Sequence, residues 1–323
     1  MNAKRSKAGT DIEITDRDVD LFQKLNAAGW LTTHQILRYF FPAKSANAVS
    51  KRLRKLINSG FLAIARTSST EQALYRLAGK GRLALVEQSS LDESEIRIPT
   101  QLPRKLKHFA AINDLRFYFE QLHHDETARL LFFFSERELN LQPLNLQSSE
   151  DPIIVGLRKH HLVPDAIAKA QFFNCSGPLD LTLALEVDIG TEHAVFFART
   201  KVEQYAQLFN QIGGHSESFR VLTFVPKLKR LIALMRETVR YLPPKHLFYF
   251  ALLEKFEQPD WNRAAIFLEP YDFFMPVQES GQIEVKERIT DDAGITQYAL
   301  LNLPATSPCR FSLREERQEA VNS

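Results

Sequence analysis

The sequence lacks the features that mark several classes of protein. It contains only two cysteines in 323 residues, Cys175 and Cys309, and their spacing matches neither a zinc site nor a disulfide framework. No stretch approaches the roughly 18 to 20 apolar residues that a membrane-spanning helix needs. The basic start, residues 1–14, is followed by no apolar segment or cleavage site, which is typical of a flexible tail rather than a secretory signal. These absences predict a cytoplasmic protein with no membrane partner.

Length and composition favour two domains. Hydrophobic residues make up 44% of the chain and charged residues 25%, which is ordinary for a globular protein long enough for two cores. Residues 91–103 are acidic at first and then bounded by prolines, so we expect a linker there. The predicted organisation is a tail (1–14), a first domain (15–90), this linker, a second domain (104–285) and a C-terminal extension (286–323). The expected fold class is α/β, or α+β overall.

The first domain has the pattern of a winged helix-turn-helix. Three residues have the chemistry of helix N-caps: Thr15, Thr32 and Ser45. The helices that they begin should end near Gly29, Pro42 and Gly60, respectively. Two strand-like segments, residues 61–66 and 73–77, follow and are joined by a polar stretch, which predicts a hairpin wing.

Basic residues concentrate in this domain, although the formal net charge of the chain is only +2. Between Lys44 and Arg82 there are nine basic residues and one acid, Glu71. Such a local excess is what contact with phosphates requires. The sequence therefore predicts binding of double-stranded DNA.

The third helix is the predicted reader of the major groove. Helical periodicity places Asn47, Lys51, Arg54 and Asn58 on the face opposite its apolar residues. Arg66 and Arg76 on the wing strands should reach flanking phosphates. Two alternatives to DNA binding stay open. The charged helix face can simply be exposed to water, or the winged helix can bind a protein.

The second domain alternates helices and strands, which predicts a mixed, largely buried sheet. Helices are expected at residues 106–122, 193–211 and 227–241. Strands are expected at residues 128–134, 181–188, 219–225 and 247–253.

Carboxylates stand at the ends of these predicted strands. Asp165 follows Pro164, and Glu186 and Asp188 lie two residues apart on one strand, hence on one face of the sheet. Three converging carboxylates would bind Mg²⁺ or Mn²⁺ and activate water, with a nearby lysine stabilising the transition state. The alternative is that these carboxylates have no catalytic role and only cap the strand end or interact with water there.

This spacing resembles the PD-(D/E)xK nuclease superfamily, with Pro164-Asp165 and Glu186-Val-Asp188 as the matching residues. Asp188 stands where that pattern has lysine. Lys201 lies on the following helix, four residues before Tyr205. Its side chain would supply the positive charge that the lysine of the pattern normally gives to the site. The resemblance implies catalytic roles for Asp165, Glu186, Asp188 and Lys201, and a metal site formed by the three carboxylates.

The motifs of both predicted domains, taken together, resemble the replication-relaxation family of bacterial plasmids and integrative elements. The residues that carry the resemblance are Asp16-Arg-Asp18, the stretch Leu31 to Gln35, Arg52 to Leu62, Tyr75-Arg-Leu77, His108, Asn113 to Arg116, Pro164-Asp165, Glu186 to Glu192, and Lys201 to Tyr205. The resemblance covers roughly residues 15–225 and implies a mobile genetic element as the setting.

Three functions remain open at this point. The first is a DNA-binding protein acting in replication, relaxation or mobilisation of such an element, with a degenerate nuclease-like domain and no cofactor. The second is an active Mg²⁺- or Mn²⁺-dependent nickase or endonuclease. The third is an interaction module that recruits a relaxase or a replication initiator. A homodimer would suit a two-fold-symmetric DNA site, although the sequence contains no dimerisation motif.

Overall fold

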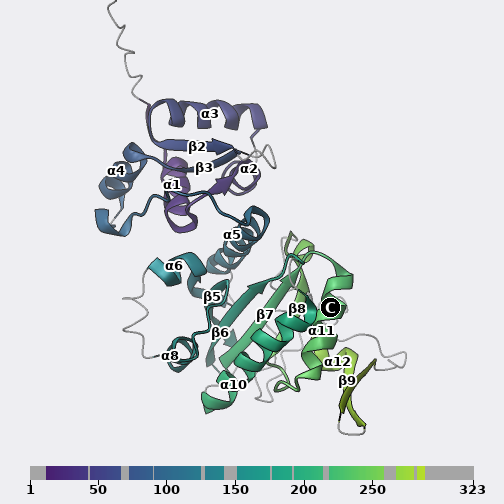
Figure 1. Ribbon diagram of the computed structural model, residues 1–323. Coiled ribbons are helices and arrows are strands. Elements are labelled where there is room, and N and C mark those ends of the chain that lie inside the picture. The colour runs from purple at the N-terminus through teal and green to yellow at the C-terminus, as the bar shows by residue number, and fades with distance from the viewer. Residues whose placement is uncertain are drawn as a thin grey trace, which may run out of the picture. The chain divides into compact units, whose positions relative to one another are not determined.

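The computed structural model describes eleven stretches of the chain (Figure 1). These are residues 12–42, 44–66, 73–89, 91–124, 128–141, 151–174, 177–190, 193–213, 218–257, 267–279 and 282–287. The chain divides into two units, Met1–Asp114 and Leu115–Ser323, which are described separately below. Helices and strands are both abundant, so the fold is α+β overall, as the sequence predicts.

Unit 1 begins with three helices, each started by a side chain that caps it. The helices are α1 (Asp16–Ala28), α2 (Thr33–Phe40) and α3 (Ala46–Asn58). Thr15 and Thr32 form full capping boxes with Asp18 and Gln35, and the Ser45 side chain accepts from the Ala48 amide. All three caps are the ones that the sequence predicts.

A small antiparallel sheet follows the third helix. Strands β2 (Leu62–Arg66) and β3 (Ala73–Leu77) form the predicted hairpin, and the two-residue strand β1 (Leu31–Thr32) pairs with the other edge of β3. The helices and this sheet enclose a core with almost no exposure to solvent, formed by Leu21, Phe22, Leu25, Ile36, Leu53, Leu56, Leu62, Leu74, Leu77 and Leu85. Figure 1 shows α3 on the outside of this unit, alongside β2.

Unit 1 extends further than the sequence predicts. It also contains α4 (Gly79–Gln88), the 3₁₀ turn η1 (Glu93–Glu95) and the beginning of α5 (Leu106–Glu120). The Trp30 indole donates to the carbonyl of Gln101 at 3.0 Å, and the Asn113 amide donates to the carbonyl of Trp30 at 2.9 Å. The predicted linker at residues 91–103 is therefore packed on unit 1, and the division falls after Asp114. Its acidic, proline-bounded composition is that of a linker, but these long-range hydrogen bonds hold it in place.

Unit 2 is built on a five-stranded mixed sheet. Its strands are β4 (Ala128–Ser135), β5 (Ala166–Asn174), β6 (Gly177–Val187), β7 (Phe219–Val225) and β8 (Phe248–Leu252), and they are adjacent in this order. Strand β5 runs antiparallel to both of its neighbours, β4 and β6, whereas β6, β7 and β8 run parallel to one another. Most residues of the parallel strands are apolar and buried, as is usual for parallel sheets.

Helices after β6 and β7 cover one face of this sheet. They are α9 (Ala194–Phe197), a π-helical turn (Ala198–Val202), α10 (Glu203–Gln211) and α11 (Leu228–Arg240). One apolar core unites α10, α11 and the facing side chains of β6, β7 and β8, such as Tyr205, Leu234, Ala184 and Val221. The smaller elements are η2 (Gln121–His124), α6 (Glu136–Leu141), α8 (Pro152–Lys159), η5 (Leu253–Glu257), α12 (Pro270–Phe273), β9 (Phe274–Glu279) and β10 (Gln282–Glu287).

Some predicted segments lie outside the described residues. They are the tail at 1–14 apart from residues 12–14, the cysteines Cys175 and Cys309, and the extension at 286–323 apart from the end of β10.

Candidate functional site

The outer face of α3 carries polar and basic side chains in the predicted arrangement. Val49, Leu53 and Leu56 are buried, and the four predicted groove-reading residues are all exposed: Asn47, Lys51, Arg54 and Asn58. Lys55 is exposed as well, and α3 contains no acidic residue. The face is therefore positively charged in its middle, from Lys51 to Lys55, and polar but uncharged at Asn47 and Asn58.

The two wing arginines differ in their surroundings. Arg66, the last residue of β2, is exposed. Arg76 is half-buried, with its guanidinium 5.5 Å from the centroid of the Trp30 ring and a 3.1 Å hydrogen bond to the carbonyl of Leu77. Arg66 is placed to reach a partner, whereas Arg76 is held against the body of unit 1.

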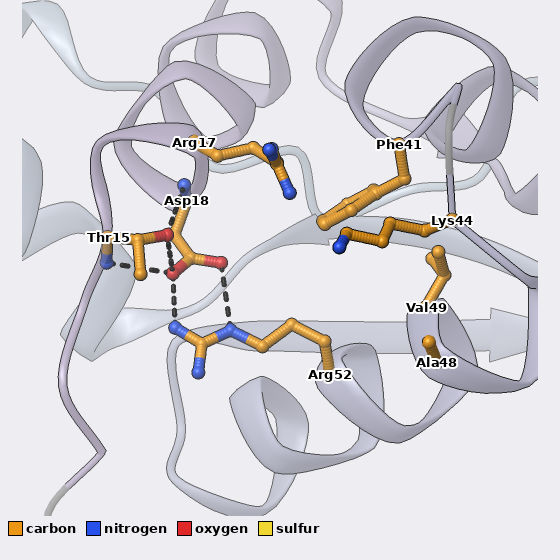
Figure 2. A pocket seen from close by; sticks show the side chains of 8 residues that line it. All are labelled: Thr15, Arg17, Asp18, Phe41, Lys44, Ala48, Val49 and Arg52. Atoms are coloured by element: carbon orange, nitrogen blue, oxygen red, sulfur yellow. Dashed lines mark hydrogen bonds and ion pairs between the residues drawn. The ribbon is translucent and has the colours of Figure 1, made fainter.

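A pocket of about 290 Å³ lies between the N-terminal ends of α1 and α3 (Figure 2). Its lining residues are Thr15, Arg17, Asp18, Phe41, Lys44, Ala48, Val49 and Arg52. Asp18 is almost fully buried and forms an ion pair with Arg52. Burial acts to raise the pKa of Asp18, but hydrogen bonds from Arg52 and Thr15 outweigh it and hold that pKa below its ordinary value.

Neither Arg17 nor Arg52 was predicted to take part in a binding site. Arg52 is separated from Asp18 by 34 positions in the chain, so no local pattern links the two. The only indication in the sequence is the excess of basic residues in this region.

In unit 2, Glu186 and Lys201 come together as the sequence analysis expects. The Lys201 amine donates to Glu186 Oε1 at 2.9 Å, and the Tyr205 hydroxyl donates to the same oxygen at 2.7 Å. Lys201 belongs to the π-helical turn and Tyr205 to α10, so residues four apart on one helical segment converge on the end of β6. Lys201 also donates to the carbonyl of Val163 at 3.2 Å.

The pKa values of all three residues of this cluster are raised, but not for the same reason. Burial raises the pKa of the Glu186 carboxyl to about 7, against the lowering effect of the Lys201 charge. Burial lowers the pKa of Lys201, but attraction to Glu186 and Asp165 outweighs it, so that pKa lies above its ordinary value. Burial and the neighbouring Glu186 raise the pKa of Tyr205 well above its ordinary value. Lys201 is thus a cation near neutral pH, and Tyr205 is a neutral hydrogen-bond donor.

The other two predicted carboxylates have partners of their own. Asp165 Oδ2 accepts from the backbone amide of Val187 at 2.7 Å, which ties the start of β5 to the end of β6. Asp188, just beyond β6, accepts from the amide of Gly190 at 2.6 Å and forms an ion pair with Arg230 on α11 at 2.5 Å. The sequence analysis missed Arg230, which lies 42 positions from Asp188 in the chain.

These pairings do not fit the predicted metal site. Protein donors already occupy oxygens of Asp165, Glu186 and Asp188, and two of the donors, Lys201 and Arg230, carry the positive charge that a metal ion would supply. Among the residues that the structure describes, no three His, Cys, Asp or Glu side chains are grouped so as to hold a metal ion. Glu186 and Asp188 are thus paired with basic side chains at the end of a buried strand, and the donor to Asp165 is a backbone amide.

The described part of the chain also contains no helix with the length and hydropathy needed to cross a bilayer.

Comparison with known proteins gives one match. The family model described as replication-relaxation matches residues 22–221, which include most of unit 1, the strands β4 to β6, Glu186, Lys201 and Tyr205. No curated protein and no solved structure is significantly similar to the chain. Since the match spans more than half of the chain, this protein belongs to the replication-relaxation family.

Proposed function

We propose that this protein binds double-stranded DNA through a winged helix-turn-helix in unit 1, with α3 in the major groove. The observation that carries the proposal is the outer face of α3, where Asn47, Lys51, Arg54 and Asn58 are exposed and no acidic residue intervenes. Asparagine and arginine form paired hydrogen bonds with base edges, and lysine and arginine neutralise phosphates.

The hairpin β2–β3 is the proposed wing. Support comes from its position directly after α3 and from the exposed Arg66 at the end of β2. An arginine at this place would contact a phosphate beside the groove that α3 occupies. We leave Arg76 out of the proposed contact surface because its guanidinium lies against Trp30.

Membership of the replication-relaxation family suggests the process that this DNA binding serves. We propose a role in the replication, relaxation or mobilisation of a mobile genetic element in the cytoplasm, with unit 1 selecting the site. Unit 2 would be a nuclease-like domain whose carboxylates stabilise the fold instead of binding a metal ion, because Glu186 and Asp188 form ion pairs with Lys201 and Arg230.

The test is DNA affinity of the full chain, measured by fluorescence anisotropy with a labelled duplex over a series of salt concentrations. The double variant Lys51→Glu/Arg54→Glu reverses two charges on the proposed reading face. Arg104→Glu/Lys107→Glu makes the same charge change at two exposed positions of unit 1 away from α3, and so serves as the matched control.

We expect the α3 variant to lose most duplex affinity and the control to lose little. Counterion release predicts that log K falls linearly with log salt concentration, with a slope of about −0.9 for each phosphate contacted. Equal affinity of the two variants would overturn the proposal and favour docking of a relaxase or a replication initiator. The stoichiometry on a duplex with two-fold symmetry would show whether the chain binds as a homodimer.

Metal-dependent nicking of DNA is a second candidate, favoured by one observation, the contact between Lys201 and Glu186. The pairing of all three carboxylates opposes it. Supercoiled plasmid incubated with the protein and Mg²⁺ or Mn²⁺ separates the two functions. Under the first proposal, wild type produces no more nicked plasmid than Asp165→Ala does. Nicking that this substitution abolishes would establish the enzyme instead.

A further inference from the structure

The pocket between α1 and α3 has an excess of positive charge. Arg17, Lys44 and Arg52 line it together with a single carboxylate, Asp18. Asp18 and Arg52 neutralise each other through their ion pair. Two positive charges, those of Arg17 and Lys44, therefore remain without a matching acid in the pocket wall.

Both of these cations are directed into the pocket. Figure 2 shows the side-chain nitrogens of Arg17 and Lys44 near the Phe41 ring, whereas the guanidinium of Arg52 is turned toward Asp18. Arg17 and Lys44 are exposed, and among the described residues neither forms an ion pair with a carboxylate. They are available to a ligand from solvent.

The arginine is also held in place before any ligand arrives. Its guanidinium carbon lies 5.2 Å from the centroid of the Phe41 ring, a cation–π arrangement that limits the rotamers of Arg17. On the opposite wall, the Asp18–Arg52 ion pair fixes α3 against the start of α1. A site whose donors are already oriented loses less conformational entropy when it binds.

We propose that this pocket binds one phosphate group, and that in the complex with DNA it holds a backbone phosphate beside the groove that α3 enters. A guanidinium matches the geometry of two phosphate oxygens, and an ammonium adds a second positive charge. The volume of about 290 Å³ is at the small end of the range for ligand sites, which suits a compact anion. The DNA part of this inference rests on the proposed function.

The pocket lies beside the face of α3 that is proposed to read the DNA bases. Ala48 and Arg52, which line the pocket, flank Lys51 on α3, so a phosphate bound there would lie next to the reading face. A phosphate contact carries no sequence information, but it fixes the orientation of the reading helix. Arg17 and Lys44 would thus set the register of α3 in the major groove.

The experiment compares Arg17→Gln/Lys44→Gln with wild type in the same anisotropy titrations. Arg104→Gln/Lys107→Gln is the matched control, and Lys44→Gln alone keeps the contact between Arg17 and Phe41. Circular dichroism checks that each variant is folded. Titrations are run with two duplexes of unrelated sequence.

Loss of one phosphate contact should make the salt slope less steep by about 0.9 and weaken binding about fivefold at 0.15 M salt. The weakening should be the same for both duplexes, and Lys44→Gln alone should show part of it. If the pocket variant keeps the affinity and slope of the control while Lys51→Glu/Arg54→Glu loses affinity, the DNA part of this inference is wrong and the proposed function stands.

Inorganic phosphate tests the pocket independently of DNA. At constant ionic strength, phosphate should raise the Tm of wild type but not that of Arg17→Gln/Lys44→Gln. If wild type binds no duplex, the proposed function fails, and this Tm shift would assign the pocket to free phosphate. Absence of both the DNA effect and the Tm shift would overturn the inference entirely.

Discussion

Replacing Asp18 with asparagine should destabilise unit 1 while leaving the shape of the side chain unchanged. The Asp18 carboxylate accepts from the amide of Thr15 at 2.9 Å, from the Thr15 hydroxyl at 2.7 Å, and from Arg52 Nε at 3.1 Å. A second guanidinium nitrogen of Arg52 completes the ion pair. Asparagine retains one acceptor oxygen for Thr15, but its amide group presents hydrogens to the guanidinium.

The expected loss follows from burial. A hydrogen bond to a charged group contributes about 1.5 to 3 kcal/mol, and one partner left unpaired in a buried place adds a desolvation cost. Asp18 is 1% exposed, but the Arg52 side chain is 24% exposed and can regain water. We therefore expect about 2 kcal/mol, near the low end of the range for charged hydrogen bonds.

Urea unfolding measured by tryptophan fluorescence provides the assay. Trp30 is buried in unit 1, and Trp261 is the other tryptophan of the chain, so the measurement uses a Trp261→Phe background. Asp20→Asn, at an exposed position of α1, is the matched control and should change stability by less than about 0.5 kcal/mol. A loss for Asp18→Asn no larger than that of the control would refute the reasoning.

The pH dependence gives a second check with a definite sign. The pKa of Asp18 is lowered in the folded protein, so its stabilisation is present above the ordinary value of 3.8 and is lost as pH falls through the folded pKa. Asp18→Asn lacks this stabilisation at every pH. The difference in unfolding free energy between wild type and Asp18→Asn should therefore shrink in acid.

Two further predictions concern buried groups. Because the pKa of Glu186 is raised to about 7, its contribution to stability is present below the ordinary value of 4.5 and is lost as pH rises through about 7. Glu186→Gln should reduce this loss of stability with rising pH, as measured by urea midpoints from circular dichroism. A pH profile of stability identical to that of wild type would contradict the raised pKa of Glu186. In α4, a Cβ on Gly81 would lie 2.3 Å from the carbonyl oxygen of Phe61, whereas one on Gly79 would meet no atom within 4 Å. Gly81→Ala should lose about 2 kcal/mol in the Trp30 assay, and Gly79→Ala should gain about 0.5 kcal/mol; equal effects would be evidence against the close approach.

Much of unit 1 was predictable because its determinants are local. The caps at Thr15, Thr32 and Ser45 join residues three positions apart, and the buried and exposed faces of α3 follow from the helical period. The hairpin β2–β3 likewise joins neighbouring segments. The extent of the unit was not predictable, because residues 91–114 are attached through hydrogen bonds to residues more than seventy positions away.

In unit 2 the sequence indicated β4, β6, β7, β8 and the helices that follow β6 and β7, together with acidic residues where β6 ends, but it did not indicate β5. The resemblance to PD-(D/E)xK nucleases implied that Lys201 would lie in the site of Glu186, and the two side chains are in contact. Only the tertiary structure decided that Asp188 pairs with Arg230, that Asp165 accepts from the Val187 amide, and that Arg17 and Lys44 share a pocket. The reason is physical: helix caps and faces depend on residues a few positions apart, whereas the partner of a buried charge is chosen by the packing of distant segments.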